Sequence, residues 1–381
     1  MNITHITTGL NDGGAEAVLY RLVCHDGPAR HHVISLMDEG KYGPLLREAG
    51  ARVTCLNMPR GRLTLRGLWR LWRVLRTGRP GVVQTWMYHG DLAGGVIARL
   101  AGVPRICWGI HNTTLEPGKS SRSTIWIASI NARLSRWVPQ AIVCCAERAR
   151  EVHAALGYAA EKMVVIPNGY DLERFKPDRG ARDRLRRDWG VADDLFLIGM
   201  VGRFDPQKDH ANLISALGEL KRAGCQFRCV LVGKDLTQDN AAINAWIAEE
   251  DLAHQVLLLG QRNDIPAVMN ALDVHVLSSA YGEAFPNVLA EAMACGTPCL
   301  STDVGDAAVI IGDIGWVVPP RNPQALADGM RAALRAREQT TAWATRQRAV
   351  RQRVVDHFSI QKMTSAYQGV WQLPHDRPPR S

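Results

Sequence analysis

Two glutamates, Glu283 and Glu291, lie eight positions apart in a short apolar segment, "GEAFPNVLAEAMACGTP". A carboxylate only accepts hydrogen bonds, so a pair of carboxylates suits a ligand with vicinal hydroxyls. Pro286 fits the first turn of a helix, and the glycine and proline at the end of the segment supply a stop. The segment therefore predicts a helix, with Glu283 on the preceding loop and Glu291 inside the helix. A core helix with two solvated acids is equally compatible with this segment alone.

Two cations, Arg203 and Lys208, follow an apolar run in "GMVGRFDPQKDHANLISAL". The pattern predicts a strand that ends near Arg203, then a turn, then an amphipathic helix. A guanidinium fork and a lysine ammonium at such a crossover can hold a diphosphate. A solvated surface pair without a ligand is the alternative.

Two further candidates follow predicted strands. Gly14 lies in the glycine-rich turn "GLNDGGAEAVL", where backbone N–H groups can approach an anion as a helix begins. This turn is neither GxGxxG nor a Walker A motif, which disfavours a dinucleotide enzyme and a P-loop NTPase; a purely structural turn fits as well. His111 ends the strand-like run "RICWGIH", which predicts a position in a ligand site at the carboxyl end of a sheet. A structural histidine is the alternative.

Strand-like runs alternate with helical stretches along most of the chain, which is typical of parallel sheets covered on both faces. We expect an α/β protein with two doubly wound, Rossmann-like domains, 1–175 and 190–355, that face a central cleft. The charged stretch 168–190 reads as a loop-like join. A helix over 356–372 is expected to pack back on the first domain, and the tail 373–381 to be disordered.

The charge of the chain is asymmetric. The net charge is +9, and residues 1–180 carry 24 Lys and Arg against 14 Asp and Glu. Such an excess suggests nucleic acid, an anionic membrane surface or a phosphorylated ligand. The chain shows neither a membrane-spanning apolar run nor a signal-peptide pattern at its start, so a cytosolic location is expected. Nine cysteines without a CxxC pair indicate reduced thiols rather than a metal site.

Taken together, these motifs resemble the family 4 group of GT-B glycosyltransferases, which are retaining enzymes that use nucleoside-diphosphate sugars. The resemblance extends over nearly the whole chain through "GGAE", "VIPNGYD", "GRFDPQKDH" and "GEAFPNVLAEAMACGTP", the last matching the E-x7-E signature of the family. Ala284 stands where many relatives have glycine. The segments "QTWMYHGDLAGG", "WGIHNT" and "TDVGDAAVIIGDIGWVVPP" resemble members that build O-antigen and other bacterial surface polysaccharides.

The resemblance implies roles for the candidate residues. Glu283 would face the donor sugar and Glu291 the ribose, while Arg203 and Lys208 would stabilise the departing diphosphate. His111 would lie beside the donor sugar, with Asn112 as a second candidate because relatives can show this histidine shifted by one position. The remaining donor-binding residues are Gly14 and the start of the predicted helix, Phe285, Pro286, Asn287 and Val288.

The same resemblance implies no cofactor and no metal, and the sequence contains no Asp-x-Asp motif. The donor could be GDP- or UDP-linked. A GT-B epimerase or hydrolase is the alternative enzyme, whereas a nucleic-acid-binding protein is disfavoured because no RNP, helix-turn-helix or zinc signature occurs.

The positive excess concentrates in "RGRLTLRGLWRLWRVLRTGR", which holds seven arginines and no acid. Five apolar residues fall at helical spacing on one stripe, Leu65, Leu68, Trp69, Trp72 and Leu75, and Arg66, Arg70, Arg73 and Arg76 flank it. This pattern predicts a helix that touches an anionic leaflet through Arg66, Trp69, Arg70, Trp72 and Arg73. A helix docked on its domain with solvated arginines is the alternative. The acid-free stretch 117–146 adds Trp126 and Trp137. We expect a peripheral enzyme on the cytoplasmic face of the inner membrane, acting on a lipid-linked saccharide acceptor.

Overall fold

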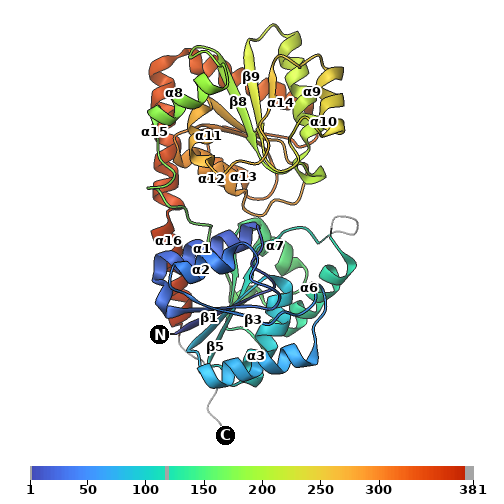
Figure 1. Ribbon diagram of the computed structural model, residues 1–381, viewed down its shortest axis with the longest axis vertical. Helices are drawn as coiled ribbons and strands as arrows, with labels where there is room; N and C mark the ends of the chain where they lie inside the picture. Colours follow the sequence, from blue (N-terminus) through green and yellow to red (C-terminus); the bar gives the residue numbers. More distant parts are fainter. Residues whose placement is uncertain (1, 116–119, 374–381) are drawn as a thin grey trace. The chain divides into compact units, whose positions relative to one another are not determined.

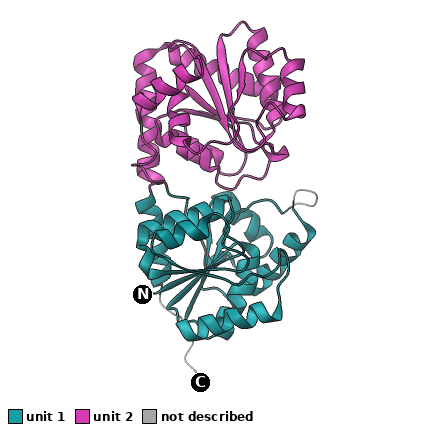
Figure 2. Cartoon of the chain, in the orientation of Figure 1, with its two compact units in different colours: residues 1–169, 360–381 teal, residues 170–359 magenta. Residues whose placement is uncertain are grey.

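The computed structural model describes residues 2–115 and 120–373 and divides the chain into two compact units (Figure 2). The first unit comprises Met1–Gly169 with Ile360–Ser381, and the second comprises Tyr170–Ser359. The chain thus returns to the first unit with its last helix. The tail expected to be disordered lies outside the described residues except for Leu373.

The first unit is built on a seven-stranded parallel sheet in the order β3-β2-β1-β4-β5-β6-β7 (Figure 1). Every residue of the two central strands β1 and β4 is buried, as expected for parallel strands covered on both faces. The strands are β1 (Ile3–Thr7), β2 (His31–Ser35), β3 (Arg52–Cys55), β4 (Val82–Trp86), β5 (Arg105–Ile110), β6 (Ala141–Cys144) and β7 (Met163–Val165).

Helices and helical turns connect these strands. They are α1 (Gly14–Asp26), η1 (Pro28–Arg30), α2 (Tyr42–Glu48), α3 (Leu65–Gly78), α4 (Met87–His89), η2 (Gly90–Gly94), α5 (Gly95–Leu100), α6 (Arg122–Leu134), α7 (Glu147–Ala155), η3 (Ala160–Lys162) and α16 (Ile360–Gln372). The stretch 90–100 is not a regular α-helix, because η2 is a π-helical turn that precedes α5. Such turns occur often at functional sites.

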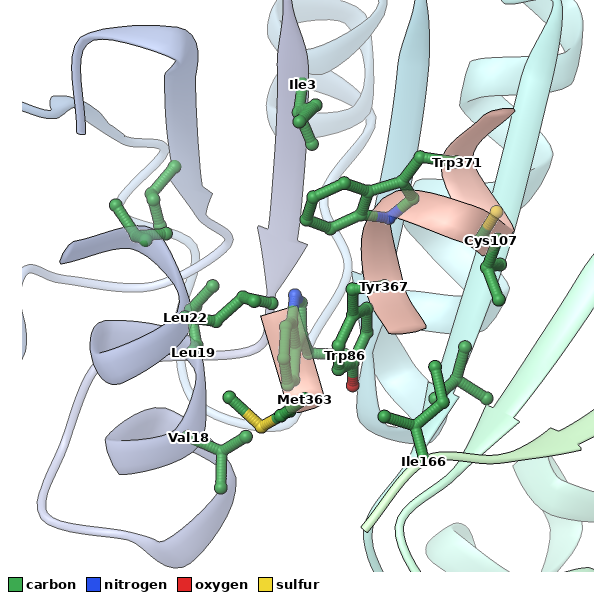
Figure 3. Close-up of a cluster of buried hydrophobic side chains, with 14 of the residues drawn as sticks. Ile3, Val18, Leu19, Leu22, Trp86, Cys107, Ile166, Met363, Tyr367 and Trp371 are labelled. Atoms are coloured by element: carbon green, nitrogen blue, oxygen red, sulfur yellow. The ribbon is translucent and has the colours of Figure 1, made fainter. Parts of the chain in front are cut away.

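Helix α16 fills the core of the first unit. Its Met363, Tyr367 and Trp371 join a buried cluster with α1 and β1 (Figure 3). The indole nitrogen of Trp371 donates a hydrogen bond to Gln84 Oε1 over 3.2 Å, which satisfies the polar edge of a fully buried ring. These contacts explain why the C-terminal helix belongs to the first unit although the whole second unit precedes it in the sequence.

The second unit has a six-stranded parallel sheet in the order β10-β9-β8-β11-β12-β13. Its strands are β8 (Phe196–Val201), β9 (Phe227–Val232), β10 (Val256–Leu258), β11 (Val274–Leu277), β12 (Cys299–Thr302) and β13 (Trp316–Val318). Its helices are α8 (Arg179–Asp188), η4 (Pro206–Lys208), α9 (His210–Arg222), α10 (Ala241–Glu249), α11 (Ile265–Ala271), α12 (Asn287–Ala294), α13 (Ala307–Ile311), α14 (Pro323–Glu338) and α15 (Thr340–His357). Both units are therefore Rossmann-like, as the sequence predicts.

Two elements differ from the sequence-based expectation. The stretch 168–190 is not loop-like throughout, because it contains α8, whose cap Asp178 accepts a hydrogen bond from the Ala181 amide. One of its arginines, Arg186, is buried and pairs with Asp273, so the charge that suggested a solvated loop is partly internal. The short edge strand β13 has no strong sequence signal, since its three residues are only half-buried.

Within the described residues, no helix is both long and apolar enough to cross a membrane. All nine cysteines are free thiols, six of them buried.

Candidate active site

The turn after β8 carries Arg203 and Lys208. The short helix η4 is capped by Asp205, whose carboxylate accepts a hydrogen bond from the Gln207 amide. Asp209 then adopts a left-handed conformation at φ 49° and caps α9. A non-glycine residue in this conformation is uncommon and concentrates at functional sites. The turn therefore holds Lys208 between two fixed caps.

Lys208 and Glu283 form an ion pair, with Nζ 2.5 Å from Oε1. Their side chains are 12% and 9% exposed, so both charges are largely removed from water and hold each other in place. The hydroxyl of Ser279 donates to the same carboxylate oxygen over 2.6 Å. The structure thus brings together two predicted residues that lie 75 positions apart in the sequence.

Two glycines allow the backbone to close around this pair. A Cβ added to Gly305 would lie 2.3 Å from the Glu283 carbonyl oxygen. A Cβ added to Gly233 would lie 2.0 Å from the Gly202 carbonyl oxygen, next to Arg203. Both contacts are too short for any side chain, so these glycines are required by close approach. Neither glycine is among the residues predicted from the sequence.

The segment after Glu283 forms the start of α12, as predicted. Pro286 is the N-cap residue, and Phe285 packs against Tyr170 and Phe358. The Tyr170 hydroxyl donates a hydrogen bond to Asn287 Oδ1. These contacts fix the orientation of the first turn of the helix.

Val288 and Glu291 lie on the same helix, where both are partly buried. Burial, together with the nearby Glu291 charge, raises the pKa of the Cys295 thiol to about 12. That thiol is therefore inert as a nucleophile at neutral pH.

Arg203 is more exposed than Lys208, at 56% of its side chain, and it pairs with Asp205 over 3.0 Å. Burial opposes ionisation of Asp205, but the Gln207 amide and the Arg203 guanidinium hold the pKa of this carboxyl below its usual value. Sequence reasoning missed Asp205 as the partner of Arg203. Its position two residues after Arg203 in a turn was the available signal.

In the first unit, His111 directly follows β5 and stacks on Trp86, with ring centroids 5.0 Å apart. Its Nε2 atom is buried and has no hydrogen-bond partner among the described residues. Burial lowers the pKa of His111 to about 4, so the ring is neutral near pH 7. The neighbouring Asn112 instead makes a local turn, in which its side-chain oxygen accepts from the Thr114 amide. Of these two residues, His111 is therefore the one whose side chain has a hydrogen-bonding atom without a partner among the described residues.

A buried chain of hydrogen bonds supports Trp86. Its indole N–H donates to His5 Nδ1 over 3.1 Å, so His5 carries its proton on Nε2. His5 then donates to His31 Nδ1 over 2.8 Å, and His31 donates to Asp26 over 2.9 Å. Burial lowers the pKa of both imidazoles, which keeps them neutral, as this direction of donation requires. The sequence contained no signal for the chain, because its members come from β1, β2, β4 and α1.

Asp91 is a second residue that sequence reasoning missed. It lies in η2, is fully buried, and accepts hydrogen bonds from the Thr85 hydroxyl and, over 3.4 Å, from the Gly109 amide. These bonds join the ends of β4 and β5 directly before His111. Burial raises the pKa of Asp91 to about 8. A lone acid after a strand was the only sequence signal.

Gly14 is the exposed first residue of α1, and Gly13 before it adopts the extended cap conformation. Gly13 supplies no side-chain cap, and the Glu16 carboxylate in the first turn accepts a hydrogen bond from its own backbone amide.

The predicted membrane-contact residues lie on α3, which begins at the Thr64 cap. The buried residues of this helix are Gly67, Leu71 and Leu75, so Leu75 is the one member of the expected stripe that is buried. Trp69 and Trp72 are 55% and 38% exposed, because they lie on the other side of the helix.

The arginines of α3 surround these rings. Arg73 lies over the ring of Trp69 and Arg76 over that of Trp72. Arg66 is exposed, and Arg70 is exposed while donating to the Leu56 carbonyl. Trp126 and Trp137 are also exposed, at 66% and 69%; residues 117–119 of their acid-free stretch lie outside the described residues.

Comparison with known proteins defines the class of this chain. The family profile "Glycosyl transferases group 1" matches residues 181–350, and "Glycosyltransferase Family 4" matches residues 12–174. The putative glycosyltransferase EpsF of Bacillus subtilis (strain 168) is 30% identical over 322 residues, which cover 79% of each chain. The chain therefore belongs to the group 1/family 4 glycosyltransferases.

Other relatives share parts of the chain or its fold. An Escherichia coli UDP-Gal:alpha-D-GlcNAc-diphosphoundecaprenol alpha-1,3-galactosyltransferase is 28% identical over 246 residues, 63% of this chain and 62% of that enzyme. The crystal structure of Anabaena Alr3699/HepE in complex with UDP superposes with a TM-score of 0.85 at 24% identity, covering 97% of this chain and 99% of that one. The lipopolysaccharide outer core galactosyltransferase WaaB superposes with a TM-score of 0.72 at 15% identity, covering 97% and 99% of the two chains. The fold is thus GT-B.

Proposed function

We propose that this glycosyltransferase transfers a sugar from a nucleoside-diphosphate sugar to a lipid-linked saccharide in the synthesis of a bacterial surface polysaccharide such as O-antigen. The observation that carries the proposal is the shielded Lys208–Glu283 pair, beside the capped turn after β8 and the start of α12. The pair places the Lys208 ammonium, which suits a diphosphate, next to the Glu283 carboxylate, which suits sugar hydroxyls. The E. coli relative, whose name specifies UDP-galactose and a diphosphoundecaprenol-linked acceptor, supports both substrate classes.

In this mechanism the second unit stabilises the leaving group. Negative charge grows on the diphosphate as the glycosidic bond breaks, and Lys208 and Arg203 lie on the turn that would meet it. Glu283 accepts hydrogen bonds from donor-sugar hydroxyls, and Glu291 from the ribose. The backbone amides at the start of α12, from Phe285 to Val288, add the positive end of the helix dipole.

The first unit contributes His111 to the same reaction, and Gly14 at the start of α1 contributes backbone amides. His111 is neutral, so its unpartnered Nε2 can exchange a hydrogen bond with a sugar hydroxyl without adding charge. We propose retention of anomeric configuration by front-face attack, in which the leaving phosphate helps to deprotonate the acceptor. We also propose a reaction without metal or cofactor, in which cationic side chains have the part that a metal takes elsewhere.

The acceptor would be met at a membrane. Trp69 and Trp72 are exposed among arginines on α3, which is the arrangement of an interfacial helix rather than of a helix docked by its aromatic face. Because a lipid-diphosphate acceptor lies at an anionic leaflet, we propose peripheral attachment to the cytoplasmic face of the inner membrane, through Arg66, Arg70 and Arg73 with the two tryptophans.

A thermal-shift panel of UDP, GDP and ADP tests the donor class. A bound ligand stabilises the fold by RT ln(1 + [L]/Kd), so the correct base should raise the melting temperature most. The matching nucleotide sugar is then incubated with and without a lipid-linked saccharide. Product that forms only with the acceptor supports transfer, whereas an isomerised or hydrolysed sugar without any acceptor would indicate the GT-B epimerase or hydrolase instead.

A further inference from the structure

A hollow of about 550 Å³ opens beside the start of α9 in the second unit. Its wall includes Asn212 and Ser215 from α9, Tyr281 from the loop after β11, and Arg321 from the loop before α14. This wall combines an amide, a hydroxyl, a phenol ring and a guanidinium. Such a mixture can recognise a ligand with several hydroxyl groups.

A second hollow of about 380 Å³ opens on the other side of the same helix start. Phe204 and Trp246 form an aromatic corner there, with ring centroids 5.8 Å apart, and His210 lies beside Phe204. Aromatic faces of this kind pack well against the apolar face of a planar or ring-shaped ligand.

The two hollows share a wall of three residues, Pro206, Asp209 and Ala211. The two hollows therefore lie on either side of this wall at the start of α9, and we call the pair together the α9 groove. The described lining of the α9 groove does not include Lys208 or Glu283. It therefore borders the site proposed for the donor, since Asp205 pairs with Arg203, but does not contain the ion pair of that site.

Buried polar atoms in this groove lack protein partners. Asn212 is 6% exposed, and neither its amide oxygen nor its amide nitrogen has a hydrogen-bond partner among the described residues. His210 is 2% exposed, and the same is true of both of its ring nitrogens. A buried polar group without a partner is unfavourable, so four such atoms on one helical turn require an explanation. A ligand in the groove supplies one.

The charges of the groove select the chemistry of that ligand. Asp205 and Asp209 line the second hollow and disfavour an anion, whereas Arg321 disfavours a cation in the first. Burial, with the nearby Lys208 charge, lowers the pKa of His210 to about 4, so its ring offers one donor and one acceptor, as the Asn212 amide does. A neutral molecule with vicinal hydroxyls and an apolar ring face satisfies all of these groups, and this is the chemistry of a pyranose.

We propose that the α9 groove binds a neutral saccharide of two or more residues at a site separate from the nucleotide-sugar donor. This inference goes beyond the proposed transfer reaction, because binding in the groove needs neither Lys208 nor Glu283. The α9 groove would bind a part of a saccharide chain that takes no part in the transfer reaction.

The test measures binding of three neutral disaccharides, maltose, lactose and N,N′-diacetylchitobiose, to the full chain by saturation-transfer NMR and titration at millimolar concentration. The protein is saturated with the nucleoside diphosphate that stabilises it most, so that the donor site is filled. We expect at least one disaccharide to bind, and Asn212→Ala and Trp246→Leu each to weaken that binding at least tenfold. Trp316→Leu, at a half-buried position on β13 outside the groove, is the matched control and should bind normally.

Because Asn212→Ala could perturb folding, Ala242→Arg provides a second route. Ala242 is exposed on α10 and lines the second hollow, so a long side chain there blocks the groove without disturbing the core. Nucleotide affinity should remain unchanged in this variant, which separates failure of the groove from failure of the donor site. The proposal is overturned if none of the three disaccharides binds, or if Ala242→Arg and Trp246→Leu leave binding intact. It is also overturned if the nucleotide or inorganic phosphate displaces the sugar.

Discussion

Lys208 and Glu283 in the second unit are charged and paired with each other, whereas His111 in the first unit is neutral and stacks on an aromatic ring. Lys208 and Glu283 balance each other at 2.5 Å, near a turn that also carries the exposed Arg203. His111 instead stacks on Trp86 and keeps a neutral ring. The same Rossmann-like architecture therefore supports two different electrostatic environments, which matches a division between stabilising a leaving diphosphate and contacting an uncharged sugar.

The supports of the two sites differ as well. In the second unit, ion pairs with Asp205 and Glu283 hold Arg203 and Lys208, so the position of each cation depends on one or two partners. In the first unit, a directed chain from Trp86 through His5 and His31 to Asp26 holds the platform under His111. Substitutions in the second unit should therefore affect binding and turnover first. Substitutions in the first unit should affect stability and its dependence on pH.

The largest effect is expected from Glu283→Ala. Loss of the carboxylate proposed to contact the donor sugar should lower kcat by more than about 100-fold, the range found when one preorganised polar contact to a transition state is removed. Nucleoside diphosphate affinity should stay close to normal, as measured by calorimetry. Glu219→Ala, which removes a helix-surface glutamate paired with Arg222, is the matched control and should keep full activity. Near-normal turnover of Glu283→Ala would falsify the assignment.

Lys208→Ala should weaken nucleoside diphosphate binding by about 1.5–3 kcal/mol, because a charge-assisted hydrogen bond is lost. The corresponding nucleoside, which has no phosphates, should bind both proteins alike in the same titration. Lys221→Ala, on the surface of α9 and paired with Asp251, is the control. An equal loss for nucleoside and nucleotide would show that Lys208 acts only on the fold.

Replacement of Arg66, Arg70 and Arg73 by Gln should reduce sedimentation with anionic liposomes, by about 1 kcal/mol for each cation near the surface. Binding of the parent protein should rise with the anionic lipid fraction and fall with salt. Turnover of a water-soluble acceptor should not change, because α3 carries no donor-binding residue. If liposome binding did not change with lipid charge, salt or the substitutions, α3 would have a structural role only.

Asp91→Asn should change stability by a smaller amount that depends on pH. The pKa of Asp91 is about 8 in the fold, against 3.8 as its ordinary value, so the fold prefers the protonated carboxyl. The stability that this preference contributes is complete below pH 3.8 and is lost as pH rises toward 8. The neutral amide avoids that loss, so the advantage of the variant over the parent in urea unfolding should grow steadily from pH 5 to pH 8. A difference that stays constant over this range would contradict a buried, protonated Asp91.

The α/β class, the two doubly wound domains and the E-x7-E helix could all be predicted from local patterns. Alternating strands and helices are set by periodicity over a few residues, and the Glu283 loop with its helix start is a continuous segment. The arginine-rich helix could also be predicted from the sequence, whereas the side of it that is buried could not. Spacing shows which residues share a side of α3, but it cannot show which side meets the sheet.

Tertiary structure alone brought Lys208 to Glu283, joined His5, His31 and Asp26 into one chain, and added α16 to the core of the first unit. Each of these contacts joins segments that are distant in sequence, and each depends on strand order and register rather than on local preference. The buried charge of Arg186 in α8 and the protonated state of Asp91 have the same origin. Burial is a property of the packed chain, so the residue type alone could not reveal it.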